Sequence, residues 1–181
     1  MDLRIQRTRK SIINAFIELR ATKPLEKITV KELSDLAFIN KATFYTHYKD
    51  IYDLAEQLEN EAVTSILNDI PHPEYLVTHP KQGIMELTSA FLRQGNLFSI
   101  LFSGTRQGIL IERIENNLKE KIYSIYPEYK INLERELLLS VLIHGNFRAF
   151  ANHKNENFDK VIEILGNISE CLLQNYEPPT P

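Results

Sequence analysis

Residues 40–49 of this 181-residue chain combine hydroxyl, aromatic and basic side chains and hold no carboxylate before residue 50. A threonine can hydrogen-bond the edge of a base or touch a thymine methyl, and lysine, tyrosine and histidine can reach phosphates. At helical spacing, one side of this segment presents Ala42, Thr43 and Thr46, with Lys41, Tyr45 and His47 toward its edges. Contact with duplex DNA is the chemistry that these side chains offer, and it needs no catalytic group.

Local signals predict two short helices that would hold this surface. Thr29 followed three residues later by Glu32 is a capping box, and Ile28 with Leu33 forms a hydrophobic staple, so a helix is expected to start at Thr29. Asn40 is a favourable N-cap for a second helix after a break of about three residues. This spacing is that of a helix-turn-helix.

The two faces of the second helix differ in character. Phe44 and Tyr48 lie one turn apart and are expected to pack on the apolar side of the first helix, which leaves the opposite, polar face exposed. The alternative is a plain three-helix subdomain whose polar residues are only solvated. We favour DNA contact because two consecutive cap-and-staple signals beside a polar, nearly uncharged face seldom coincide.

Residues 3–66 resemble the N-terminal domain of TetR/AcrR-type transcriptional regulators. The resemblance depends on Ile28-Thr29-Val30-Lys31-Glu32-Leu33 and on the more specific Thr43-Phe44-Tyr45-Thr46-His47-Tyr48. It implies that the start of the first helix and the aromatic residues of the second bind phosphates, whereas the first turns of the second helix contact bases. The implied phosphate contacts are Thr29, Tyr45 and His47, the implied base contacts are Lys41, Ala42, Thr43 and Thr46, and Lys49 is a further expected phosphate contact.

Two residues depart from the pattern of that family. Phe38 occupies the turn position where glycine is usual, and a phenylalanine does not adopt a positive φ cheaply, so we expect a slightly different turn. Ile51 stands where many members have lysine, which removes one expected contact with the DNA backbone.

Charge is unevenly distributed along the chain. The formal net charge is -3, but residues 1–50 contain ten Lys or Arg and six Asp or Glu, a net charge of +4, and the remainder has a net charge of -7. The basic end is therefore the expected nucleic-acid end. Arg4, Arg7, Arg9 and Lys10 concentrate this charge near the first helix, where each is either a phosphate contact or merely solvated.

Composition limits the other possibilities. Cys171 is the only cysteine, so an intrachain disulfide and a thiolate zinc site are excluded, and we expect no metal and no cofactor. Asp2 and Arg4 follow Met1 where a signal peptide would be apolar, and no run of eighteen apolar residues occurs. We therefore expect a cytoplasmic protein without a membrane partner.

The periodicity of the whole chain predicts an all-α fold. Residues 1–50 would form a three-helix DNA-binding domain, residues 51–70 a connecting helix capped by Asp50, and residues 71–181 a helical effector-binding and dimerisation domain. Pro71, Pro73 and Pro80 predict a linker or mobile loop, after which helical periodicity resumes near Gln82. Further helices are expected at 109–125, from 137 to about 150, and at 158–173.

The last two helices predict a homodimer. Residues 137–150 are apolar on more than one side, and residues 158–173 form a second amphipathic helix. Pairing both with their copies would make a four-helix interface in which Gly145 allows close approach. A buried central helix within a monomer is the alternative.

No enzymatic motif is present, so we do not expect an enzyme. Several aromatic residues would suit an effector pocket, with Arg106, Arg148 or His144 orienting an anionic ligand, although ordinary core packing explains the same residues. These aromatic residues are Phe91, Phe98, Phe102, Tyr123, Tyr126 and Phe147.

The sequence thus predicts a homodimeric transcriptional regulator that binds a near-palindromic operator in double-stranded DNA. We expect a repressor released by an effector bound in the C-terminal domain, whose identity the sequence does not indicate. The alternative is a coactivator-type protein whose C-terminal domain docks on a metabolic enzyme.

Overall fold

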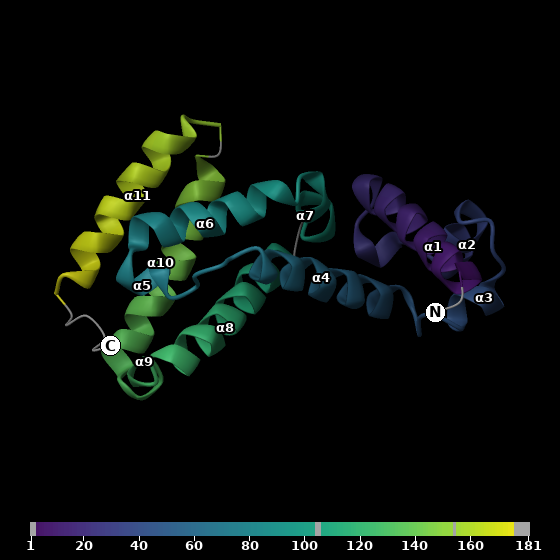
Figure 1. Cartoon of the computed structure of the whole chain (residues 1–181). Helices are drawn as coiled ribbons and strands as arrows, with labels where there is room; N and C mark the ends of the chain where they lie inside the picture. Colours follow the sequence, from purple (N-terminus) through teal and green to yellow (C-terminus); the bar gives the residue numbers. More distant parts are fainter. Residues whose placement is uncertain (1–2, 104–105, 154, 176–181) are drawn as a thin grey trace. The chain divides into compact units, whose positions relative to one another are not determined.

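The chain is all-helical in the computed structural model, which describes residues 3–103, 106–153 and 155–175 (Figure 1). Helices account for 80% of the chain, and the described residues form no strand, so the expected all-α class is confirmed. The chain divides into two compact units, each made of two segments. We call residues 1–62 with 95–107 the N-terminal unit, and residues 63–94 with 108–181 the C-terminal unit.

The N-terminal unit packs short helices against one long helix. Its elements are α1 (Leu3–Thr22), the 3-10 turn η1 (Leu25–Lys27), α2 (Val30–Leu36), α3 (Lys41–Tyr45), the first part of α4 (Ile51–Asn68) and α7 (Asn96–Leu101). The stripe expected on the first helix forms the core, since Ile12 and Phe16 are fully buried. Phe44 and Tyr48 are buried as expected for the packed side of α3.

Three side-chain caps begin the helices of this unit where the sequence predicts them. Thr29 accepts a hydrogen bond from the backbone N–H of Glu32 at 3.2 Å, and Asn40 accepts one from that of Thr43 at 2.7 Å. Asp50 accepts one from the N–H of Asp53 at 2.8 Å. The Glu32 carboxylate does not complete the capping box at Thr29, because it pairs with Lys23 instead.

The turn between α2 and α3 differs from the expectation at Phe38. Its φ is 55°, so the turn keeps the left-handed conformation that a glycine would adopt, although the residue is a phenylalanine. That conformation costs an L-residue about 1–2 kcal/mol. The backbone N–H of Ile39 closes the turn on the carbonyl of Ser34 at 3.0 Å, which holds Phe38 in this conformation.

A segment distant in sequence, residues 95–107, completes the N-terminal unit. Phe98 and Phe102 stack with their ring centroids 5.4 Å apart, and both are buried. The guanidinium of the buried Arg20 donates to the carbonyl of Ser103 at 3.1 Å. Arg106 forms a two-pronged ion pair with Glu59 of α4, in which Nη2 lies 2.6 Å from Oε2.

The described residues of the C-terminal unit form the remainder of α4 and six further helices. They are α5 (Tyr75–Thr78), α6 (Pro80–Arg93), α8 (Gln107–Ile125), α9 (Glu128–Ile131), α10 (Leu133–Asn152) and α11 (Phe158–Leu173). Helix α6 packs on α11 and more lightly on α10. A Cβ at Gly166 would lie 2.9–3.1 Å from Lys81 atoms, so this glycine permits the close approach of α6 and α11.

Three predictions in this part of the chain were wrong in detail. Residues 71–80 are not merely a loop, because they contain α5, whose Leu76 and Val77 are buried. Pro80 is the first residue of α6, where its missing N–H costs no helical hydrogen bond. Helix α10 starts at Leu133 rather than residue 137, because Asn132 caps it by accepting from two backbone N–H groups.

The Arg106–Glu59 pair gives the first prediction. Glu59 is 1% exposed and Arg106 19%, so replacing Arg106 with methionine removes two hydrogen bonds from a buried carboxylate. We expect Arg106→Met to lower the free energy of unfolding by about 3 kcal/mol in urea titrations. The matched control is Arg93→Met, since Arg93 pairs with Asp69 at the surface and is 54% exposed; its cost should be below about 1 kcal/mol. Equal effects of both substitutions would contradict this reasoning.

Candidate nucleic-acid interface

The predicted DNA contacts lie on α3 and at its two flanks. Thr29 is the N-cap of α2, residues 41–45 form α3, and Lys49 precedes α4. Most of these side chains are exposed, and Thr43 and His47 are half-buried. The structure therefore places the predicted residues on or next to one short helix of the N-terminal unit, except Thr29, which lies at the start of the preceding helix α2. The exposed members are Thr29, Lys41, Ala42, Tyr45, Thr46 and Lys49.

Helix α3 itself is shorter than the predicted segment, but its hydrogen bonding continues beyond Tyr45. The backbone N–H of Thr46 donates to the carbonyl of Ala42 at 3.2 Å, and that of His47 to the carbonyl of Phe44 at 2.9 Å. Tyr48 likewise donates to Phe44 at 3.0 Å. Thr46 and His47 thus occupy one more helical turn and keep a fixed direction relative to α3.

Both threonine hydroxyls of this surface already donate within the protein. Thr43 Oγ1 donates to Asn40 Oδ1 at 2.9 Å, and Thr46 Oγ1 donates to the carbonyl of Thr43 at 2.7 Å. While these bonds persist, each hydroxyl can only accept from a ligand. Bases offer matching donors in the major groove, namely the amino groups of adenine and cytosine, and the threonine methyls suit a thymine methyl.

The aromatic side chains of the surface are positioned by the core. The Tyr45 ring meets the buried Phe44 ring edge to face, with centroids 5.5 Å apart, and remains 56% exposed. The His47 ring lies 6.2 Å from that of Tyr48. A buried ring thus lies beside the exposed ring of Tyr45 and beside the half-buried ring of His47.

The basic residues near this surface differ in their contacts: Arg9 pairs with a carboxylate, whereas the side chains of Lys49, Arg7 and Lys10 are exposed. The backbone N–H of Lys49 donates to Asp53 at 2.8 Å, and this bond is the first cause of the lowered pKa of the Asp53 carboxyl. The Lys49 side chain itself is exposed. Arg9, which the sequence offers as a phosphate contact, pairs with Glu61 of α4, whereas Arg7 and Lys10 are exposed on α1.

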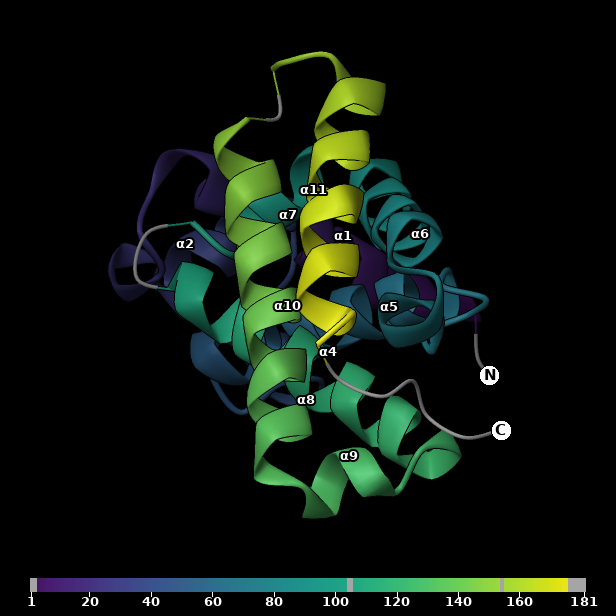
Figure 2. The same ribbon diagram turned by 90° about the vertical axis from the view of Figure 1, so that its left-hand side faces the viewer.

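The C-terminal unit has an apolar face on α10 and α11. On α10, Leu133, Leu137 and Val141 follow each other at intervals of four residues and are exposed, and Gly145 continues the line. On α11, three further exposed residues repeat in the same way: Ile164, Ile168 and Leu172. Figure 2 shows the two helices side by side on the face toward the viewer. A groove of about 500 Å³ between them is lined by Ala149, Val161, Ile164 and Ile168 among others.

The residues proposed for an effector pocket are divided between the two units. Phe98, Phe102 and Arg106 belong to the N-terminal unit, where Arg106 binds Glu59. Phe91 and Phe147 do meet in the C-terminal unit, with centroids 5.2 Å apart. His144 and Arg148 are exposed on the same side of α10 as Val141, at helical spacing from it. Arg106 therefore belongs to a different unit from His144 and Arg148, and a pocket that includes all three stays a prediction.

His144 takes part in a polar network between α8 and α10. Its Nε2 lies 2.6 Å from Glu115 Oε2, and Ser140 Oγ donates to Glu115 Oε1 at 2.7 Å. Lys119 Nζ lies 2.9 Å from Glu115 and 2.6 Å from Glu136. Burial raises the pKa of Glu115, but the hydrogen bonds from Ser140, Lys119 and His144 outweigh burial and hold its pKa at about 2.

Sequence reasoning did not identify Glu59 and Arg106 as structural partners. Glu59 lies among the buried residues Ala55, Ala62 and Val63 of α4. A carboxylate within an apolar stripe requires a cation or hydrogen-bond donors from elsewhere. The position of Glu59 within an apolar stripe was therefore a signal in the sequence that it needs a partner. The sequence does not specify which distant cation pairs with it.

Comparisons with known proteins add no assignment. No model of a known protein family matches the chain, and no curated protein matches it. None of the helices built by the described residues is long and apolar enough to cross a membrane. Within the same residues, no group of three or more His, Cys, Asp or Glu side chains could hold a metal ion.

The low pKa of Glu115 gives a pH-dependent prediction. Because its pKa is lowered in the folded state, the stabilisation is complete above the unfolded value of about 4.5 and is lost as the pH falls toward about 2. Glu115→Gln should lower the free energy of unfolding by about 2–3 kcal/mol at pH 7. Urea titrations from pH 7 to pH 2 should show this difference shrinking below pH 4.5.

The matched control for Glu115 is Glu112, an exposed carboxylate on the same helix. Glu112→Gln should change the free energy of unfolding by less than about 0.5 kcal/mol. A difference between wild type and Glu115→Gln that stays constant with pH would show that the carboxylate charge is not the stabilising feature.

Proposed function

We propose that the chain is a sequence-specific DNA-binding transcriptional regulator of the TetR/AcrR type. The single observation that supports this most is the exposed surface of α3, where hydroxyl, aromatic and basic side chains project from a capped helix that is anchored by the buried Phe44. Its threonines read base edges in the major groove, and Tyr45, His47, Thr29 and Lys49 bind phosphates on either side. The function is binding rather than catalysis, and the cytoplasm is its setting.

The regulator acts as a homodimer joined through α10 and α11. Exposed leucine, isoleucine and valine side chains repeat on both helices, and a polar protein surface rarely leaves such a stripe in water. Self-pairing of this face makes a four-helix interface with two-fold symmetry. Two DNA-binding units related in this way suit a near-palindromic operator with half-sites about one helical turn apart.

Regulation follows from an effector that binds the C-terminal unit and favours one arrangement of the dimer. A ligand that prefers the arrangement unsuited to two successive major grooves releases the operator, which is the behaviour of a repressor. The alternative is a coactivator-type protein, whose effector is a metabolic enzyme docked on the C-terminal unit. One observation favours this alternative: Arg106 and His144, two of the residues proposed to orient an anionic ligand, already contact the carboxylates of Glu59 and Glu115.

Base contacts and phosphate contacts should respond differently to mutation. Tyr45→Phe and His47→Ala should weaken binding to every sequence by a similar factor, because phosphate contacts position the protein without reading bases. Thr43→Ala and Thr46→Ala should instead change the preferred base at one position of the half-site. The measurement is selection of bound sequences from a random DNA pool, followed by titration of the selected operator.

The buried Tyr48 offers the negative control for this experiment, because its hydroxyl is not presented to a ligand. Tyr48→Phe should change neither base preference nor general affinity by more than about twofold. If Tyr45→Phe altered base preference while the threonine substitutions did not, the assigned roles would be reversed. If the wild-type protein selected no sequence, the proposed function itself would be wrong.

The proposed dimer predicts that a charge on the apolar face separates the subunits. Val141→Glu and Ile168→Glu each place a carboxylate where the partner's apolar side chains would pack, so both variants should sediment as monomers at micromolar concentrations at which wild type is a dimer. Met85→Glu is the control, since Met85 is also an exposed apolar residue but lies on α6. A wild-type protein that is monomeric at micromolar concentration would remove the dimer from the proposal.

A further inference from the structure

Phe38 combines two unfavourable features at one residue. It has the left-handed φ of 55°, which L side chains rarely adopt, and its side chain is 95% exposed. Because the ring is almost fully exposed, its packing does not offset the energetic cost of the strained backbone. Strained, exposed residues of this kind concentrate at binding sites.

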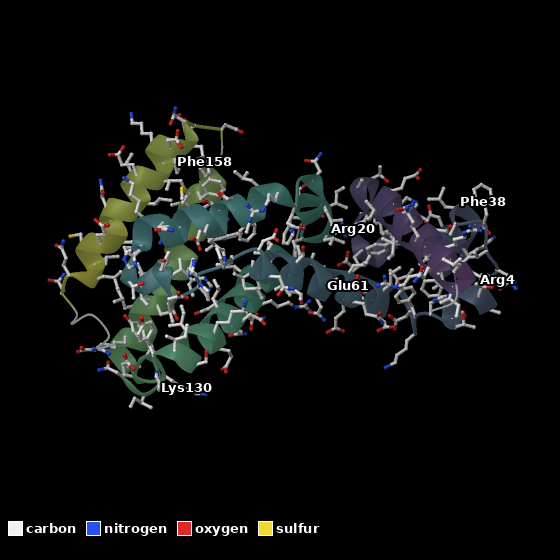
Figure 3. The ribbon with its side chains drawn as sticks, in the orientation of Figure 1. Arg4, Arg20, Phe38, Glu61, Lys130 and Phe158 are labelled. Atoms are coloured by element: carbon white, nitrogen blue, oxygen red, sulfur yellow. The ribbon has the colours of Figure 1, made fainter. Side chains whose placement is uncertain are left out.

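The position of Phe38 indicates what the ring would meet. It lies in the turn that leads to Asn40, the N-cap of α3, and the exposed Lys41 and Ala42 follow directly. Figure 3 shows its side chain extending outward from the N-terminal unit. Because Phe38 lies three residues before the first residue of α3, its ring would lie close to a ligand bound at the first turn of α3.

The charge around the ring favours DNA over an apolar partner surface. The first 50 residues have a net charge of +4, and the exposed residues Lys41, at the start of α3, and Lys49, after its end, add positive charge on either side of that helix. Duplex DNA is anionic, yet it also offers apolar groups at the groove edge, namely deoxyribose rings and thymine methyls. A phenyl ring among basic and hydroxyl side chains matches this combination.

We propose that Phe38 is an additional DNA contact, whose ring packs on a thymine methyl or deoxyribose beside the bases read by α3. This inference rests on the proposed DNA-binding function. It assigns a binding role to the phenylalanine that stands at the turn position where glycine is usual. The turn imposes the left-handed conformation, and the ring that Phe38 carries there is exposed rather than packed.

Two ringless variants separate the ring from the strain. Phe38→Ala removes the ring and keeps the strained φ, whereas Phe38→Gly removes both, because glycine adopts positive φ at no steric cost. Thermal unfolding should therefore give a melting temperature a few degrees higher for Phe38→Gly than for Phe38→Ala. Both variants should nevertheless lose about three- to tenfold in affinity for the selected operator. Ile131→Ala, at an 85% exposed residue in the C-terminal unit, is the control and should bind as wild type.

Substituted operators identify the group that the ring touches. Replacing each thymine by uracil removes only the C5 methyl, so a methyl contact would weaken wild type at one position and leave Phe38→Ala unaffected there. A uniform loss in Phe38→Ala, with no position at which uracil matters, would assign the ring to deoxyribose. Either result supports the contact.

Three results would be decisive against the inference or its basis. Wild-type affinity in both ringless variants would overturn the contact while leaving the DNA-binding function intact. Loss in Phe38→Ala but not in Phe38→Gly would show that a turn without the ring keeps full affinity, and would also overturn the contact. Failure of the wild-type protein to bind any selected DNA would refute the proposed function itself.

Discussion

The N-terminal unit depends on the ion pair between Glu59 and Arg106. A carboxylate that is 1% exposed is costly unless donors surround it, and the fork of a guanidinium supplies two of them in one plane. This pair joins α4 to residues 95–107, and the Arg20 guanidinium adds a second bond to Ser103 in the same segment. The small helices that hold α3 thus share a core with residues far along the chain.

This arrangement defines how a signal would reach the candidate DNA surface. The chain passes between the two units at three places: between residues 62 and 63 within α4, between 94 and 95, and between 107 and 108. The proposed regulation therefore has two covalent routes between the units, one through α4 and one through the segment 95–107. The sequence suggests only α4 as a connection, because nothing local in residues 95–107 indicates a partner in α4.

Local chemistry explains which features were predictable. The caps at Thr29, Asn40 and Asp50 depend on side chains within three residues, so the sequence alone located them. The prolines near residue 75 were misinterpreted because Pro80 is compatible with the first turn of a helix and because Leu76 and Val77 are buried by tertiary packing. Phe38 was misjudged for the opposite reason: the surrounding turn imposes a backbone conformation that the residue itself disfavours.

The non-local core also decides which truncations are informative. A fragment of residues 1–70 contains every predicted DNA contact, yet it lacks α7, the buried rings of Phe98 and Phe102, and Arg106. Glu59 would then lose the two hydrogen bonds that its ion pair supplies, and part of the apolar surface of α1 would face water. Weak DNA binding by such a fragment would report an incomplete unit rather than the absence of a second subunit. A monomeric full-length variant keeps the segment 95–107, so it separates the contribution of dimerisation from that of folding.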